Sequence, residues 1–347
     1  MSRVYLDHAA TAPLRAEARA AMAAAMDVVG NPSSVHAEGR AAKALVERAR
    51  AQVAEALGAG EADVIFTSGA TEAAALALAG RGLQGSAIEH DAVAAWIDAV
   101  LPVDAQGRVT VADPARSTLQ WANSETGVVQ DLPDGLAVSD LTQGFGKLPF
   151  SYAWAGVERV SVSAHKIGGP KGVGALVIPR GADLAAQLKG GGQEMGRRAG
   201  TENIIGIAGF GAAAQAAQAD LAAGRWDEVA QLRDLLENLL EENARETIFV
   251  GKGSKRLPNV TALVTPGWKG ETQVMAMDLA GFAISAGSAC SSGKVKASRV
   301  LQEMGLSQAD AASAIRVSLG LETTRDEVTA FAQAWLRKHE NMRARVA

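Results

Sequence analysis

Strand patterns that run directly into small-residue turns are the feature that most constrains this fold. Residues 63–78, DVIFTSGATEAAALAL, predict a strand, a Ser-Gly turn and an alanine-rich helix. Residues 157–166, VERVSVSAHK, alternate as a strand does and lead into a Gly/Pro turn, after which GALVI predicts another strand. Strands interleaved with helices are typical of a layered α/β fold with a mostly parallel sheet.

A change of texture near residue 225 predicts a second part of the molecule. The chain has 347 residues, which is enough for two cores. Residues 226–244 predict a long amphipathic helix, and short strand patterns and a final helix with a Thr-x-x-Glu capping box follow it. We therefore predict a large domain over residues 15–225. A smaller α/β domain would comprise residues 1–14 and 226–347.

Composition and charge argue against several classes of protein. The net charge of −4 gives no reason to expect nucleic acid or an anionic membrane as a partner. The opening residues do not show the pattern of an export leader, and no apolar run reaches the roughly 18 residues of a membrane span, so we expect neither an export signal nor a membrane span. The single cysteine fits a reducing cytoplasm and cannot build a cysteine-based metal site, and the five histidines are widely spaced. We predict a cytoplasmic protein without a metal.

Three polar motifs at predicted strand ends suggest chemistry. TSGATE (67–72) offers backbone N–H groups at a helix N-terminus and the Thr71 hydroxyl, which suit a phosphate, although an ordinary strand-to-helix turn is equally compatible. Asp140 in DLTQ could pair with a protonated pyridine nitrogen, or could serve as a cap or turn residue. Lys166 ends a strand and could form a Schiff base, or could be a surface lysine.

The only cysteine, Cys290, lies in a glycine- and serine-rich loop, SAGSACSSGKVK (285–296). This loop is similar to a nucleotide-binding P-loop, but five residues separate its glycines and Val295 follows Lys294. A P-loop has four intervening residues and a Ser or Thr after the lysine. GFGAAA (209–214) lies inside a helical pattern rather than after a strand. Neither segment predicts nucleotide binding.

Taken together, the motifs resemble those of the cysteine desulfurases, in the class V aminotransferase group of fold-type-I pyridoxal phosphate (PLP) enzymes. The resemblance extends from YLDHAATAP (5–13) to IRVSLG (315–320). Between them, in the family's order, stand GNPSSVH (30–36), TSGATE, EHDAV (89–93), ETGVVQD (125–131), DLTQ, SAHKIGGPKG (163–172), GGGQEMGRRAGTEN (190–203) and SAGSACSSG. The resemblance implies PLP as cofactor and the conversion of L-cysteine to L-alanine with transfer of its sulfur.

The resemblance also implies a role for each matching residue. Lys166 would hold PLP, Asp140 would keep the pyridine nitrogen protonated, and Gln143 would bind the ring hydroxyl. His90 would stack on the ring and assist proton transfer, and Cys290 would accept the sulfur as a persulfide. The other implied cofactor contacts are Ala70, Thr71, Ser163, His165 and, from the partner subunit of a homodimer, Thr201; the implied substrate contacts are Asn31, Asn123 and Arg316.

The resemblance leaves the pathway open. A sulfur-acceptor protein is implied, whether for iron–sulfur clusters, thiolated tRNA or another cofactor. One alternative is a selenocysteine lyase, which would share the PLP site without needing Cys290 in the same way. Another alternative is a non-catalytic interaction protein on the same scaffold.

Three departures from the family pattern accompany the resemblance. Ser124 replaces a family asparagine, and the interval from Thr71 to His90 is short. Only eight residues separate Asp131 from Asp140, whereas a parallel crossover needs about a dozen. We therefore predict that one covering helix is missing. Repacked local segments or a second protein would then cover residues 72–140.

Overall fold

The computed structural model describes residues 3–287 and 297–346. A four-stranded sheet forms the centre of the larger part, in the order β2 (Ala62–Thr67), β7 (Gly174–Pro179), β6 (Val157–Ser163) and β5 (Leu136–Asp140). β5 and β6 are parallel, and β7 is antiparallel to both of its neighbours. β2, β6 and β5 therefore run in one direction and end at the same edge of the sheet.

The sheet continues beyond β5 through shorter parallel pairings. Thr118 forms a parallel bridge with Val138, and Ser117 forms one with β3 (Gln84–Ser86). β3 in turn pairs in parallel with β4 (Asp98–Leu101), which is the outer strand of this row. Counted across this row, most pairings are parallel, so the predicted α/β architecture is confirmed.

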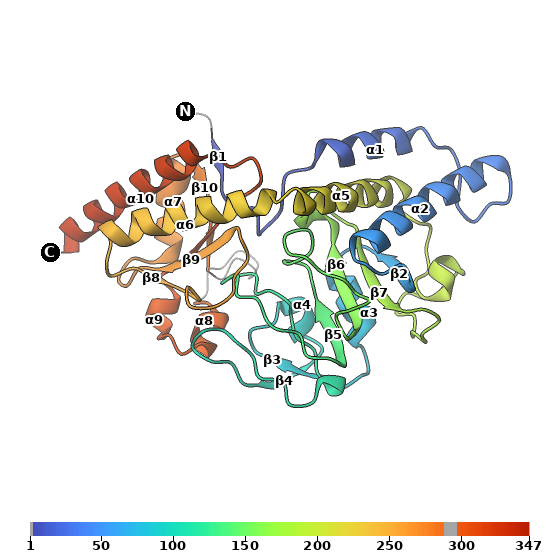
Figure 1. Ribbon diagram of the computed structural model, residues 1–347, viewed down its shortest axis with the longest axis horizontal. Coiled ribbons are helices and arrows are strands. Elements are labelled where there is room, and N and C mark those ends of the chain that lie inside the picture. The colour runs from blue at the N-terminus through green and yellow to red at the C-terminus, as the bar shows by residue number, and fades with distance from the viewer. Residues whose placement is uncertain (1–2, 288–296, 347) are drawn as a thin grey trace.

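Helices cover both faces of this sheet (Figure 1). α1 (Ala16–Met26), α2 (Ala37–Ala56) and α5 (Ile204–Ala222) pack together on one face, and α3 (Ala70–Leu78) lies on the other. The buried residues of α2 lie at three- and four-residue spacings, which places them on one side of the helix: Gly39, Ala42, Val46, Ala49 and Val53. α3 consists mostly of alanine and leucine residues, and most of these are buried.

A second sheet lies at the centre of the smaller part. Its antiparallel strands follow the order β11 (Ser285–Ala286), β12 (Ala314–Ser318), β9 (Val260–Val264) and β8 (Ile248–Phe249). β1 (Val4–Tyr5) pairs in parallel with β10 (Phe282–Ala283) beside it. The remaining elements of the chain are α4 (Asp91–Ala94), α6 (Arg225–Asn243), α7 (Gly270–Leu279), α8 (Arg299–Glu303), α9 (Gln308–Ala311), α10 (Arg325–Val346) and the 3₁₀ turns η1 (Pro114–Arg116), η2 (Ala164–Lys166) and η3 (Gln193–Gly196).

Hydrophobic clusters support the division near residue 225. Leu6 packs in one cluster with Trp226, Val317 and Trp335, so the N-terminal strand belongs with the C-terminal part. The predicted capping box is present at the start of α10, where Thr324 N donates to Glu327 Oε2 at 2.8 Å. We propose residues 15–225 as the larger domain, with residues 1–14 and 226–347 as the smaller one.

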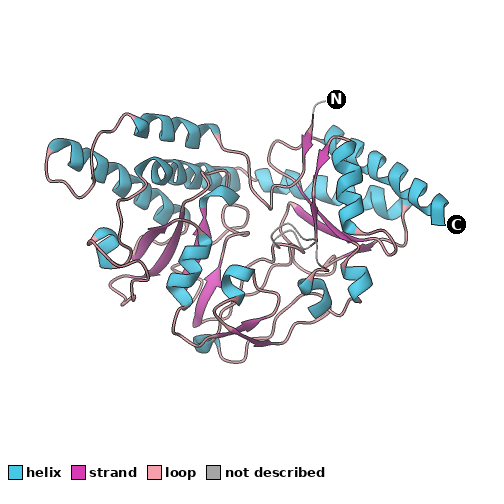
Figure 2. Ribbon diagram, turned by 180° about the vertical axis from the view of Figure 1, so that it is seen from behind, coloured by secondary structure: helices cyan, strands magenta, loops and turns pink. Residues whose placement is uncertain are grey.

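No helix occurs between Asp131 and Asp140, the interval in which the sequence predicted a missing crossover helix; a short turn leads directly into β5. Figure 2 shows loops in this region, between the helices of the two parts. Trp121 instead packs against Phe150, with ring centroids 5.1 Å apart. Leu257 and Val260 of the smaller part enter the same core cluster as Trp121, and both are fully buried. Segments of this chain therefore cover the part of the sheet that the missing helix would otherwise leave exposed.

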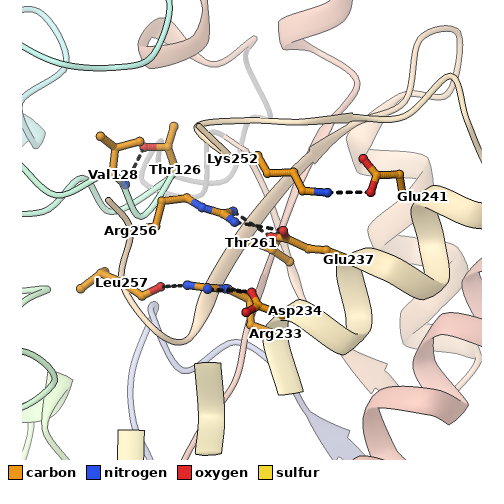
Figure 3. Close-up of polar contacts among 10 residues, drawn as sticks. All are labelled: Thr126, Val128, Arg233, Asp234, Glu237, Glu241, Lys252, Arg256, Leu257 and Thr261. Carbon is orange, nitrogen blue, oxygen red and sulfur yellow. Dashed lines mark hydrogen bonds and ion pairs between the residues drawn. The ribbon is translucent and has the colours of Figure 1, made fainter. Parts of the chain in front are cut away.

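The loop over residues 251–258 is held firmly against both parts (Figure 3). Arg256 donates two hydrogen bonds to Glu237 of α6, at 2.7 and 2.9 Å, and Thr261 donates a third at 2.6 Å. Leu257 N donates to Gly127 O at 2.8 Å. Arg256 and Glu237 are both buried, so breaking their ion pair would leave an uncompensated charge in the interior. The pair therefore anchors the 251–258 loop to α6.

None of the helices within residues 3–287 and 297–346 is both long and apolar enough to span a membrane.

Candidate active site

A cavity of about 550 Å³ lies at the edge where β2, β5 and β6 end. Ligands bind at such edges because the carboxyl ends of strands that run in one direction meet there. Eight predicted cofactor residues line the cavity: Ala70, Thr71, His90, Asp140, Gln143, Ser163, His165 and Lys166. These residues come from motifs almost 100 positions apart, and the shared strand direction brings them together.

Lys166 stands at the end of η2, directly after the end of β6. Its Nζ donates to Ala9 O at 2.7 Å and to Ala10 O at 2.9 Å. A buried second amine, Lys147, donates to Gln143 O at 2.8 Å. Burial, together with the neighbouring charge of Lys166, lowers the pKa of Lys147 to about 7. Lys147 was not predicted as a site residue from the sequence, where its only signal is its place four residues after Gln143.

Asp140 is oriented by three donors to one of its oxygens. Oδ1 accepts from Thr142 N at 2.9 Å, Thr142 Oγ1 at 2.5 Å and Ser161 Oγ at 3.3 Å. The carboxylate is thus fixed at the cavity wall by its own turn and by the adjacent strand β6. Such a group suits a protonated pyridine nitrogen, which needs an anionic acceptor at a fixed position.

The opposite wall is electrically suited to an anion. The first residues of α3, Ala70 and Thr71, line it, and an N-terminal helix end presents unpaired N–H groups. Lys171 and Lys166 line the same cavity. Burial and the nearby lysine charges lower the pKa of His165 to about 4, so its imidazole is neutral at neutral pH and hydrogen-bonds Thr11 Oγ1 at 3.2 Å.

The residues present fit PLP. Gln143 Oε1 lies buried in the cavity wall without a hydrogen-bond partner among the described residues, while its Nε2 donates to Ala9 O at 2.9 Å. Buried amide oxygens are normally paired, so a polar group of a ligand is expected there. An anion-binding helix end, a fixed carboxylate, an unpaired amide oxygen and a lysine match the phosphate, pyridine nitrogen, ring hydroxyl and aldehyde of PLP.

His90 precedes α4 and lines the cavity. Its Nδ1 accepts from Ala92 N at 3.1 Å, so the neutral ring carries its proton on Nε2. Glu89 beside it is buried, and its Oε1 accepts from Gln120 N at 2.7 Å. Burial raises the pKa of Glu89 to about 8.

The predicted substrate residues lie away from the cavity wall. Arg316 is buried, and it donates to Ser124 O at 2.7 Å, Asp7 Oδ1 at 2.9 Å and Ser285 Oγ at 3.3 Å. Its Nε has no hydrogen-bond partner among the described residues. The guanidinium is thus held close to the loop that bears Ser124, and Asp7 already balances its charge.

Asn123 does not line the cavity, and backbone groups engage both ends of its amide. Nδ2 donates to Ile88 O at 3.1 Å, and Oδ1 accepts from the backbone N–H groups of Glu125 and Thr126, each at 2.9 Å. Ser124, the predicted departure from the family pattern, lines the cavity in its place.

Two further predicted residues, Asn31 and Thr201, do not line this cavity. Asn31 is exposed in the loop between α1 and α2, where its Oδ1 accepts from Ser33 N at 2.9 Å. Thr201 is exposed before α5. Cys290 lies outside the described residues. No group of three metal-ligating His, Cys, Asp or Glu side chains occurs within residues 3–287 and 297–346.

Comparison with known proteins defines the family. The model of the Aminotransferase class-V family matches residues 4–331. A cysteine desulfurase of Cereibacter sphaeroides is 37% identical, covering 94% of this chain and 93% of that protein. The NifS-like protein of Rickettsia africae has a similar structure, with a TM-score of 0.88, 30% identity and coverage of 97% and 99%. A structure described as SspA in complex with cysteine matches with a TM-score of 0.76 and 26% identity, over 92% and 100%.

The match extends over nearly the whole chain, and the cavity holds the lysine, aspartate, glutamine and histidine that the motifs predicted. This chain therefore belongs to the cysteine desulfurases of the class-V aminotransferase family, PLP-dependent enzymes of fold type I.

Proposed function

We propose that the protein converts L-cysteine to L-alanine and transfers the sulfur to Cys290 as a persulfide. The observation that carries this proposal is the grouping of Lys166, Asp140, Gln143 and His90 around one cavity. PLP, when bound, supplies an electron sink for bond breaking next to the substrate amine. The neighbour described as SspA was solved in complex with cysteine, which supports this choice of substrate.

Each residue has a defined task in this proposal. Lys166 holds the cofactor, Asp140 pairs with its ring nitrogen, and Gln143 binds its ring hydroxyl. The phosphate is held by the start of α3 with Ala70 and Thr71, and by Ser163 and His165. His90, with its proton on Nε2, is oriented by Ala92 N for proton transfer to or from the substrate.

Arg316 binds the substrate carboxylate. A planar guanidinium suits a carboxylate, and the Nε of Arg316 still has a hydrogen to donate. Because Asp7 occupies one of the terminal nitrogens at 2.9 Å, a carboxylate that binds in bidentate fashion must displace that contact or share it. Asp7 therefore keeps the guanidinium paired until the substrate arrives.

We further propose a cytoplasmic homodimer that delivers sulfur to an acceptor protein. Thr201 is exposed and does not line the cavity of its own chain, as expected for a group that serves the partner subunit. The solution mass, measured by light scattering, tests the dimer. A purely monomeric protein that binds PLP normally would contradict the proposed role of Thr201.

The non-catalytic alternative has little support from the cavity. A scaffold retained only for interactions would not need a lysine, a fixed aspartate and a helix end that line one cavity. Ser124 lines the cavity, so a polar side chain still occupies the position of the family asparagine.

Two variants test the proposed reaction in the purified protein. Lys166→Ala should abolish the visible absorbance of lysine-bound PLP and the production of alanine from cysteine. Cys290→Ser should keep that absorbance and bind cysteine, yet release almost no alanine, because the sulfur has lost its acceptor. Full alanine production by Cys290→Ser would instead favour a lyase that needs no protein nucleophile.

A further inference from the structure

The segment between β7 and α5 contains strained backbone. Glu194 has φ 50° and ψ 40°, and Met195 has φ 58° and ψ 35°. They are the two non-glycine residues with positive φ in the part of the chain that the structure describes. Gly196 continues the left-handed turn with φ 79°. In such a conformation Cβ crowds the backbone, so the turn persists only if its surroundings hold it.

A buried ion pair holds this turn. Glu194 accepts from Arg50 Nη1 at 2.7 Å and from Nη2 at 3.0 Å, and Phe66 N donates to it at 3.1 Å. The Glu194 side chain is 2% exposed. Arg50 belongs to α2, donates to Val64 O at 2.6 Å and lies 4.8 Å over the Phe66 ring. The turn is thereby pinned to α2 and β2 at once.

A second contact holds the segment four residues later. Arg198 Nε donates to Glu72 Oε1 at 2.8 Å. Glu72 lies in the first turn of α3, and its other oxygen accepts from Ser68 N at 2.8 Å. Gly200 N donates to the Gln193 side chain at 3.1 Å. The segment is thus fixed at Glu194 and again at Arg198, and Thr201 lies exposed three residues after the second contact.

We propose that Arg50 and Glu194 are positioning residues that set Thr201 for the cofactor phosphate of the partner subunit. This inference rests on the proposed function, in which PLP binds in a homodimer and Thr201 acts across the interface. An exposed threonine contributes to affinity only if its backbone is already ordered, since ordering it on binding would cost conformational entropy. The pinned left-handed turn provides that order, and its strain explains why a charged anchor with three donors is needed.

The first test is the affinity for PLP of Glu194→Gln homodimers. Apoprotein is titrated with PLP, and the visible absorbance of the lysine-bound cofactor is followed. We expect affinity to fall about tenfold to hundredfold, as for loss of one hydrogen bond to a charged group. Glu47→Gln is the matched control, because Glu47 contacts the same Arg50 at 3.2 Å but is 53% exposed and does not touch the turn. The control should bind PLP as the unchanged protein does.

Heterodimers separate action across the interface from action within one subunit. In the first pair, one chain carries Lys166→Ala and the other carries Glu194→Gln. The lysine-bound cofactor then forms only in the Glu194→Gln chain. The phosphate of this cofactor meets the intact Thr201 segment of the partner chain. We expect the affinity of the unchanged protein.

In the second pair, one chain carries both substitutions and the other carries none. The lysine-bound cofactor now forms only in the unchanged chain. The phosphate of this cofactor meets the Thr201 segment of the partner chain, which the Glu194→Gln substitution has loosened. We expect the tenfold to hundredfold loss here alone. Both pairs contain the same substitutions, so a general loss of stability would affect them equally.

The inference would be overturned if the first pair bound PLP weakly, whatever the second pair does. It would also be overturned if both pairs bound PLP as the unchanged protein does. Absence of a lysine-bound cofactor in the unchanged protein would instead show that the proposed function fails. A second readout needs no cofactor: hydrogen exchange of residues 192–201 in the apoprotein should become faster in Glu194→Gln and stay unchanged in Glu47→Gln.

Discussion

The two ends of the active site are built in different ways. At the cofactor end, Asp140 and Ser163 are the last residues of the neighbouring strands β5 and β6, and Lys166 follows three residues later. Asp140 is oriented by its own turn. At the substrate end, Arg316 comes from the smaller part and is held by Asp7 and by the loop around Ser124. The residues of the cofactor end are thus placed by the ends of strands that share one sheet, and Lys166 is held further by Ala9 and Ala10. The substrate end has no such sheet edge and depends on contacts between residues hundreds of positions apart. Substitutions at the two ends should therefore affect different steps.

Asp140→Asn should produce the largest effect at the cofactor end. The amide would keep hydrogen bonds to its neighbours but lose the negative charge that keeps the ring nitrogen protonated. We expect kcat to fall about 1,000-fold, as for loss of a preorganised electrostatic contact, while the cofactor remains bound to Lys166. Steady-state rates and the absorbance of bound PLP measure the two quantities. A nearly unchanged kcat would show that the ring does not use this carboxylate.

Glu125→Gln should reveal a pH-dependent cost at the substrate end. Burial raises the pKa of Glu125 from its ordinary 4.5 to about 7, against the opposing effects of Ser298, Arg316 and Arg299. Between these values the folded protein holds a proton that the unfolded chain has released. The stability from this group is therefore complete below pH 4.5 and is lost as the pH rises to 7.

The difference in unfolding free energy between Glu125→Gln and the unchanged apoprotein isolates this effect. It should shift in favour of the variant by about 3 kcal/mol as the pH rises from about 4.5 to 7, and then level off. Denaturant titrations at a series of pH values give the curve. A difference that does not depend on pH would mean that Glu125 ionises normally in the folded protein.

Arg316→Lys should impair the substrate end alone. A lysine keeps the charge but loses the planar pair of donors, so kcat/KM for cysteine should fall about 30- to 100-fold. PLP affinity should stay unchanged, because Arg316 does not line the cofactor cavity. A parallel loss of PLP affinity would show that the two ends are not separable in this way.

Asp7→Asn should have the smallest effect, and in the opposite direction. Asp7 competes with the substrate carboxylate for Arg316, to which it is bound at 2.9 Å. Its neutralisation should lower KM for cysteine about threefold, since the neutral amide oxygen competes less strongly than the carboxylate for the buried guanidinium. The KM of the Arg316→Lys, Asp7→Asn double variant should show no such gain. A raised KM in the single variant would indicate that Asp7 orients Arg316 instead of competing for it.

The sequence by itself located the strand ends of the cofactor site, and the resemblance to the family assigned a role to each residue there. Alternation and turn residues locate the ends of β2, β5 and β6, and parallel strands place these ends at one edge of the sheet. The short interval before Asp140 also predicted the missing helix. These features are local, because periodicity and turn chemistry act within about ten residues.

Only the tertiary structure decided the remaining features. It buries Lys147 beside Lys166, engages Asn123 in its own loop and places Leu257 in the core of the larger part. It also pairs Arg316 with Asp7, 309 positions away, and Arg50 with Glu194, 144 positions away. No local pattern encodes such partners, because the free energy of each contact depends on which surfaces the rest of the chain brings together and shields from water.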